Sequence, residues 1–140
     1  MSVNEILVTA GRTLQDACHE ASANAGWWGA WGADYRLPDD VMRLRSGDRF
    51  GKLLATQKLC LAHSELSEAM EGLRKDLPDD KLPHRKMFEV ELADAAIRIF
   101  DLAGAMGFDL GAAIAEKMTY NAQRADHKPE ARAAVGGKAF

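Results

Sequence analysis

Apolar residues recur at helical spacing through the first part of the chain. Between residues 2 and 24 they fall three or four positions apart: Val3, Ile6, Leu7, Ala10, Leu14, Ala17 and Cys18. Ser2 and Glu5 form a capping-box pattern, in which each residue satisfies a free backbone N–H at the start of a helix. Asn24 and Gly26 suit the end of a helix. The pattern predicts a first helix that opens at Ser2 and closes at about residues 24–26.

Three further helices follow from the same periodicity and from residues that start or stop helices. The second covers about 48–74 and stops before a proline, which cannot continue a helix. The third starts near Pro83, a residue suited to the first helical position, and ends near residue 104 or 107. The fourth begins after Asp109, a good N-cap, and continues to about residue 126.

The pattern predicts one all-α domain over residues 1–140. Its parts are an N-terminal helix with a Trp-rich irregular segment (1–47), a helical core (48–126) and a flexible tail (127–140). The 24 Ala and 15 Leu outnumber the 13 Val, Ile and Thr residues, which favours helix over strand. We therefore expect a four-to-five-helix bundle.

Charge and composition exclude several classes of protein. The net charge is −3, so the basic surface that nucleic-acid binding needs is missing. No apolar run is long enough to span a membrane, and the first residues do not resemble a signal peptide. Two cysteines are too few for a disulfide framework or a zinc cluster. We expect a cytoplasmic protein that binds neither nucleic acid nor membrane.

The irregular segment contains three tryptophans within five residues, at Trp27, Trp28 and Trp31. Such an apolar load in a loop more often packs over a bundle or forms a partner interface. The functional alternative is an aromatic wall on which a nucleobase stacks.

Four acidic residues lie on helix faces that are otherwise apolar. At about 100° per residue, Glu65 and Glu68 share a face with the leucines of the second predicted helix. Glu91 and Asp94 line up with apolar residues and Arg98 on the third. Buried carboxylates are costly and repel one another, so they require protons, bases or a metal ion, and one arginine cannot offset four. The usual meaning of a single such pair is a solvated face, but two pairs on consecutive helices predict a metal site.

The ligand type indicates the metal. Carboxylate-bridged di-iron bundles use Glu-x-x-His pairs, which this chain does not have. All-oxygen ligation favours Mg²⁺, or Mn²⁺, and phosphoryl chemistry. Asp101 lies near the same face and could be a further ligand or a partner of Arg98, although we assign it a structural role.

A second apolar row runs along the other side of the 48–74 helix: Leu59, Leu66, Met70 and Leu73. A helix that is apolar on two sides belongs at the centre of a bundle or in an oligomer. On the fourth predicted helix, Lys117, Asn121 and Arg124 share one face and could hold phosphate oxygens.

These residues resemble a known family. Glu65-Leu-Ser-Glu68, 22 intervening residues and then Glu91-Leu-Ala-Asp94 resemble the paired E-x-x-E and E-x-x-D motifs of MazG-like nucleoside triphosphate pyrophosphohydrolases. That family belongs to the all-α NTP pyrophosphatases. Residues 109–124 are similar to its last core helix, and residues 136–140 to the tail of its small bacterial and phage members. The resemblance covers residues 48–140 and a single copy of a module that two-domain MazG proteins carry twice.

The resemblance implies hydrolysis of nucleoside or deoxynucleoside triphosphates to monophosphate and pyrophosphate. Glu65, Glu68, Glu91 and Asp94 would hold Mg²⁺, and one of them, or Glu71, would deprotonate water. The phosphates would contact Lys117, Asn121 and Arg124, with Lys138 as a further candidate. The base would contact Trp27, Trp28, Trp31 and Phe50. The family also implies a homodimer or a dimer of dimers with a site near the subunit interface.

Two other functions stay open at this stage. A non-catalytic helical interaction module would use the acids and tryptophans to bind a partner. A related phosphohydrolase, such as a phosphoribosyl-ATP pyrophosphohydrolase or a nucleoside diphosphate hydrolase, would use the same metal site on another substrate.

Overall fold

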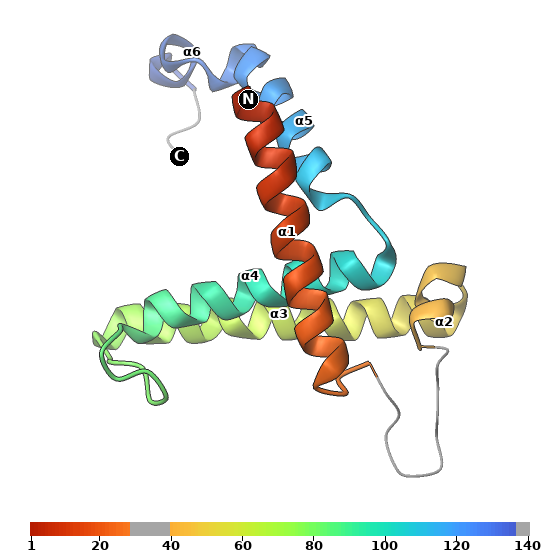
Figure 1. Cartoon of the computed structure of the whole chain (residues 1–140). Coiled ribbons are helices and arrows are strands. Elements are labelled where there is room, and N and C mark those ends of the chain that lie inside the picture. The colour runs from red at the N-terminus through yellow and green to blue at the C-terminus, as the bar shows by residue number, and fades with distance from the viewer. Residues whose placement is uncertain (29–39, 137–140) are drawn as a thin grey trace. The chain divides into compact units, whose positions relative to one another are not determined.

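The computed structural model describes residues 1–28 and 40–136, and it is all-α, as predicted. Figure 1 shows the helices, and the described part of the chain contains no strand beyond one isolated bridge between Pro78 and Lys86. The helices are α1 (Val3–Asn24), α2 (Asp40–Ser46), α3 (Arg49–Lys75), α4 (Met87–Met106), α5 (Leu110–Gln123) and α6 (Pro129–Ala133), with one 3₁₀ turn (Ala125–His127). The short α2 and α6 bring the count above the four or five helices expected.

The predicted helix starts are confirmed at three places. The Ser2 backbone N–H donates to Glu5 Oε2 at 2.6 Å, and the Glu5 N–H donates to Ser2 Oγ at 3.3 Å. Asp48 accepts from the backbone N–H of Gly51 at 2.7 Å before α3. Asp109 caps α5 in the same way. Local side-chain chemistry is therefore sufficient to fix these boundaries.

The start of α4 was predicted wrongly near Pro83, and the helix begins at Met87. The buried Asp79 carboxylate accepts from the backbone N–H groups of Lys81 and Leu82 at 3.0 and 2.6 Å. The N–H of Met87 donates across the loop to the Leu77 carbonyl at 3.0 Å. These bonds hold the chain in a closed turn, so helical hydrogen bonding starts only after it.

The helix α2 lies in the segment that was predicted to be irregular. Its Leu44 is 2% exposed, and Arg45 Nε donates to the Ala105 carbonyl near the end of α4 at 2.8 Å. A side chain at Gly51 would place its Cβ 2.1 Å from the Arg43 carbonyl oxygen, so α2 and the start of α3 are in close contact. Tertiary contacts of this kind stabilise a helix too short to form alone.

The described helices divide into two compact units. The α3–α4 unit comprises residues 13–108 and the α1–α5 unit comprises residues 1–12 and 109–140, so the helix α1 contributes to both. The predicted core of 48–126 is thus shared between the units, and α6 lies within the predicted tail. Residues 137–140 fall outside the described range.

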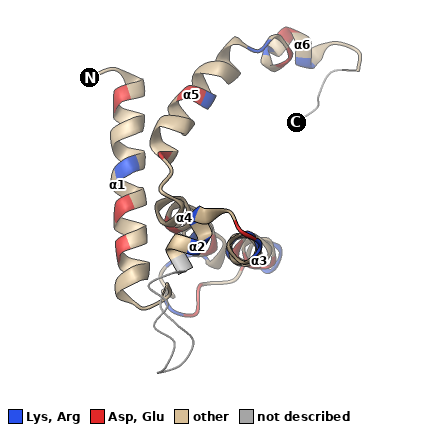
Figure 2. Ribbon diagram, turned by 90° about the vertical axis from the view of Figure 1, so that its right-hand side faces the viewer, with Lys and Arg blue, Asp and Glu red and all other residues tan. Residues whose placement is uncertain are grey.

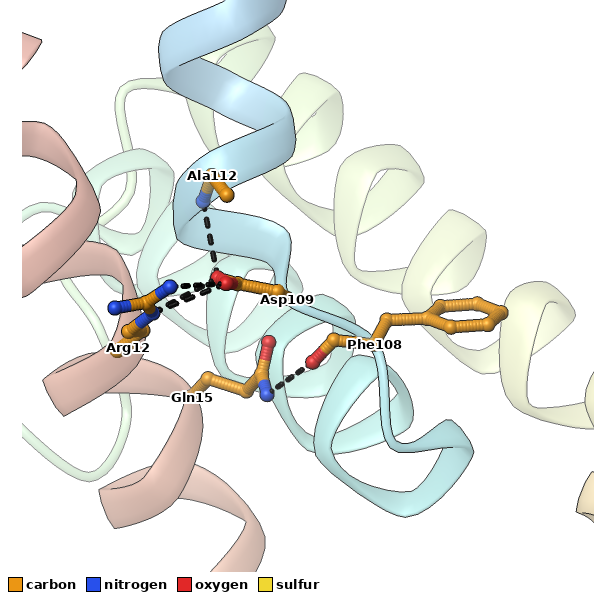
Figure 3. A network of polar contacts seen from close by, with 5 residues as sticks. All are labelled: Arg12, Gln15, Phe108, Asp109 and Ala112. Atoms are coloured by element: carbon orange, nitrogen blue, oxygen red, sulfur yellow. Dashed lines mark hydrogen bonds and ion pairs between the residues drawn. The ribbon is translucent and has the colours of Figure 1, made fainter.

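In the α3–α4 unit, α3 and α4 lie side by side as an antiparallel pair (Figures 1 and 2). A small core of Trp28, Leu44 and Ala105 packs where α2 meets them. The second half of α1 contacts α4 closely, because a Cβ at Gly104 would lie 2.6 Å from the Cβ of His19. Gln15 Nε2, also on α1, donates to the Phe108 carbonyl at 2.7 Å (Figure 3).

In the α1–α5 unit, the first turns of α1 pack antiparallel to α5. A Cβ at Gly11 would lie 2.5 Å from the Cα of Gly111, so the two backbones nearly touch. Arg12 forms an ion pair with Asp109, and the same carboxylate accepts from the Ala112 N–H at 3.0 Å (Figure 3).

Residues 1–28 and 40–136 include no helix that combines the length and the apolar character needed to cross a membrane.

Candidate metal centre and adjoining cleft

Three of the four predicted acids converge between α3 and α4. Glu65, Glu91 and Asp94 each present a carboxylate oxygen, and these oxygens lie within 4.8 Å of one another. Glu65 and Glu91 are 6% and 8% exposed, whereas Asp94 is more accessible. Glu68 is exposed and close enough for its charge to act on Glu91. The predicted convergence of acids on consecutive helices is therefore present within the α3–α4 unit.

Small residues bring the two helices close enough for the acids to meet. Ala62 and Ala69 are buried one turn on either side of Glu65, and Ala95 is buried one turn after Glu91. At Gly72 an added Cβ would lie 2.9 Å from the Cβ of Met87. Close helix packing thus places carboxylates where larger apolar side chains would otherwise fill the interface.

The electrostatics of the cluster are unbalanced. Arg98 Nε donates to Glu65 Oε1 at 2.5 Å, which offsets one negative charge. Burial, the hydrogen bond with Glu65 and the charge of Glu68 together raise the pKa of Glu91 to about 7, and burial contributes most. Burial and the charge of Glu65 also raise the pKa of Asp94. Four acids against one arginine leave a net negative site at neutral pH.

This donor set fits a hard divalent cation. Every candidate ligand is a carboxylate oxygen, and the described residues offer no histidine or cysteine in the cluster. Mg²⁺ and Mn²⁺ prefer such oxygens, and Glu65, Glu91 and Asp94, with Glu68 beside them, would hold the ion. A bound cation would offset the repulsion between carboxylates that, together with burial, raises the pKa values of Glu91 and Asp94.

A cleft of about 450 Å³ adjoins the acids in the same unit. Asp94 and Arg98 lie in its wall, so a ligand in the cleft would be beside the acid cluster. The remaining polar wall comes from Ser22, Lys58 and Asp101, and the apolar wall comes from Trp27, Leu61 and Ile97. The cleft therefore combines acidic, basic and aromatic surfaces.

The four predicted base-binding residues have different environments. Trp27 is 73% exposed and lines the cleft, whereas Trp28 is 7% exposed and packs in the core. Phe50 lies under the guanidinium of Arg43, 5.1 Å from the ring centre, and is not part of the cleft wall. Trp31 lies outside the described residues. Trp27 is the described aromatic residue placed to stack on a ligand.

The predicted phosphate-binding residues belong to the α1–α5 unit. Lys117 and Arg124 border a surface hollow of about 630 Å³. The Lys117 ammonium lies 4.8 Å from the centre of the Tyr120 ring, and Arg124 forms an ion pair with Asp126. Asn121 Oδ1 is buried and has no hydrogen-bond partner in the part of the chain that the structure describes. Lys138 lies outside that part.

Sequence reasoning missed Lys58 in the cleft wall and the partners of Asp101. Lys58 lies seven residues before Glu65, two turns earlier on the same face of α3, and this spacing could have revealed it. Its ammonium donates to the Trp27 carbonyl at 3.2 Å and lies 4.0 Å from the centre of the Trp28 ring. Asp101 pairs with residues of the N-terminal region and not with Arg98, and no local signal predicted those partners.

The chain was compared with known families, curated proteins and solved structures, and none of them matches. Its function is accordingly inferred from the residues of the site.

Proposed function

We propose that this protein is a metal-dependent nucleoside triphosphate pyrophosphohydrolase. The reaction would convert a nucleoside or deoxynucleoside triphosphate and water into the monophosphate and pyrophosphate, in the cytoplasm. The observation that carries the proposal is the convergence of Glu65, Glu91 and Asp94 within 4.8 Å, two of them buried, with Arg98 as their basic partner. A divalent cation would neutralise the negative charge of this site. Without one, the buried carboxylates lower the stability of the fold.

The substrate's phosphates would lie at the acidic end of the cleft. Glu65, Glu91 and Asp94, with Glu68 beside them, would hold Mg²⁺, which would supply positive charge that lowers the energy of the negative charge developing on the phosphate oxygens. Arg98 and Lys58 line the neighbouring wall and would attract the same oxygens. On the α1–α5 unit taken by itself, Lys117, Asn121 and Arg124 stay proposed as residues that hold phosphate oxygens.

The residue that deprotonates water is proposed to be one of the four acids. Glu71 was the other candidate, but ion pairs with Lys75 and Arg74 lower its pKa. A carboxylate held by two bases is a weak proton acceptor. The four acids of the cluster therefore remain the proposed candidates for the base.

A homodimer or a dimer of dimers is part of the proposal. The second apolar row of α3 is exposed in the single chain: Leu59, Leu66, Met70 and Leu73 are 57%, 44%, 69% and 61% exposed. An apolar row of this length on one helix is typical of an interaction surface. The same observation favours the second candidate function, a helical interaction module without catalysis. Sedimentation of the purified protein would measure the oligomeric state.

A product assay tests the proposal. Purified protein with Mg²⁺ is given a panel of canonical and modified triphosphates, and pyrophosphate is measured separately from phosphate. We expect monophosphate plus pyrophosphate from wild type, and loss of both products in Glu68→Gln and Glu91→Gln. Glu71→Gln, a matched change on the surface of α3, should keep wild-type activity.

The other outcomes separate the alternatives. Diphosphate with phosphate, or turnover of phosphoribosyl-ATP or a nucleoside diphosphate alone, would indicate a related phosphohydrolase. No turnover, together with a melting temperature that Mg²⁺ does not change, would contradict the metal site and favour the interaction module.

A further inference from the structure

The cleft beside the acid cluster ends at a second carboxylate, Asp101. This residue lies seven positions after Asp94 on α4, so the two share a helix face about 10 Å apart along the axis. Arg98 lies between them on the same face and also lines the cleft. A ligand whose phosphates lie at Asp94 and Arg98 would extend its uncharged end toward Asp101.

Asp101 is held in a fixed orientation by two donors from the N-terminal region. His19 Nδ1 donates to Asp101 Oδ1 at 2.9 Å, and Trp28 Nε1 donates to the same oxygen at 2.7 Å. The close contact of His19 with Gly104, one turn after Asp101, leaves α1 little room to shift. Both donors use Oδ1, and no other residue within 1–28 and 40–136 donates a hydrogen bond to Oδ2 of this cleft-lining side chain.

An aromatic wall lines the same cleft as Asp101. Trp27 is 73% exposed and lines the cleft, and it directly precedes in sequence the buried Trp28 whose indole N–H donates to Asp101. An indole face stacks on a nucleobase without reading its identity, because every base has a π face. A rigid carboxylate is different, because it accepts hydrogen bonds and repels carbonyl oxygens.

We infer that Asp101 determines base specificity by accepting a hydrogen bond from an amino group on the base stacked against Trp27. The inference rests on the proposed function for the position of the phosphates. It favours bases with an exocyclic amino group over bases that present a carbonyl oxygen at the same place. Cytosine against uracil, and adenine against hypoxanthine, are matched pairs that differ in this group.

The experiment measures kcat/KM for CTP, UTP, ATP and ITP with Mg²⁺. Wild type should prefer CTP over UTP and ATP over ITP, each by roughly 10-fold to 100-fold. Asp101→Asn keeps the shape of the side chain but adds a donor, so both ratios should fall to within about threefold. Asp80→Asn, the same change on an exposed loop carboxylate, should leave both ratios unchanged.

A wild type without preference within either pair would overturn the inference, even if Asp101→Asn did not fold. Unchanged ratios in a folded and active Asp101→Asn would also overturn it. Quenching of tryptophan fluorescence by each nucleotide gives a readout that does not require turnover. Selective binding of CTP and ATP without hydrolysis would support the inference while contradicting the proposed function. Equal binding of all four nucleotides would overturn the inference alone, and absent binding together with absent turnover would contradict both.

Discussion

In the α1–α5 unit each acid that caps a helix lies against a base or a backbone donor, whereas in the α3–α4 unit three acids lie against one another. Asp109 accepts from Ala112 and forms an ion pair with Arg12, and both charged side chains are about half exposed. Glu65 and Glu91 are buried, and Arg98 is the base beside them. Acids of the first kind stabilise a helix end, and acids of the second kind cost stability.

The contrast shows how charges that stabilise a fold differ from charges kept for another purpose. Surface ion pairs contribute little and are easily replaced. Buried acids without matching bases lower the stability of a protein. Such acids are retained where they bind a ligand or a metal ion. Three of the four predictions that follow test this distinction between charges, and one tests the helix contact of the α1–α5 unit; they begin with the largest effect.

Removing one carboxylate from each unit should affect activity very differently. Glu65→Gln should lower triphosphate hydrolysis by about 100-fold or more, because it removes a ligand charge and the partner of Arg98. Glu5→Gln, which removes a capping carboxylate from α1, should leave the rate unchanged. The measurement is pyrophosphate release at saturating Mg²⁺, and comparable losses in the two variants would contradict the distinction.

Helix contact at Gly11 should dominate the stability of the α1–α5 unit. Alanine normally favours a helix over glycine by about 1 kcal/mol. Here the added Cβ would overlap the backbone of Gly111, so Gly11→Ala should instead lower the free energy of unfolding by about 1–3 kcal/mol. Urea unfolding followed by circular dichroism measures this, and a gain in stability would show that the helices can separate without cost.

The acid cluster should make stability depend on pH in the absence of metal. The pKa of Glu91 is about 7 in the folded chain against an ordinary value of 4.5, so the folded state binds the extra proton. The stabilisation that comes from binding this proton at Glu91 is fully present below about pH 4.5, and it is lost as the pH rises through about 7. In EDTA, the melting temperature of wild type should therefore fall relative to that of Glu91→Gln between these values.

Saturating Mg²⁺ should reverse that trend, because a cation binds the ionised carboxylates. A difference between wild type and Glu91→Gln that stays constant with pH in EDTA would contradict the raised pKa.

The smallest effects should come from the paired charges of the α1–α5 unit. Asp109→Ala removes both the helix cap and the ion pair, whereas Arg12→Ala removes the ion pair alone. The drop in melting temperature should be larger for Asp109→Ala, and the drop for Arg12→Ala should disappear in high salt. Equal drops in melting temperature would mean that the ion pair between Arg12 and Asp109, and not the helix cap, stabilises the start of α5.

Helix starts were predictable where one side chain satisfies its own neighbouring backbone. Ser2, Asp48 and Asp109 all act within three residues of their position, so the sequence contains the whole interaction. The start of α4 was not predictable, because backbone hydrogen bonds from Asp79 to Arg85 and from Met87 to Leu77 close the loop over longer separations in sequence. The helix α2 was missed for the same reason, since Arg45 finds its acceptor near the end of α4.

The candidate site also has a part that could be predicted from the sequence and a part that could not. The acids were found because Glu65, Glu91 and Asp94 lie on apolar helix faces, a pattern that needs only helical geometry. The partners of Asp101 were not found, because His19 and Trp28 are 82 and 73 residues away in sequence. Contacts of that range arise from packing, which one sequence does not reveal.

The three converging acids all belong to the single hairpin of α3 and α4, and fewer than 30 residues separate the first from the last. Contacts so close in sequence form early and quickly when a chain folds. The repulsion among the acids is therefore present already in the folding transition state. Neutralising Glu91 should accelerate folding more than it slows unfolding, and stopped-flow kinetics with and without Mg²⁺ would show whether a cation assists the nascent hairpin.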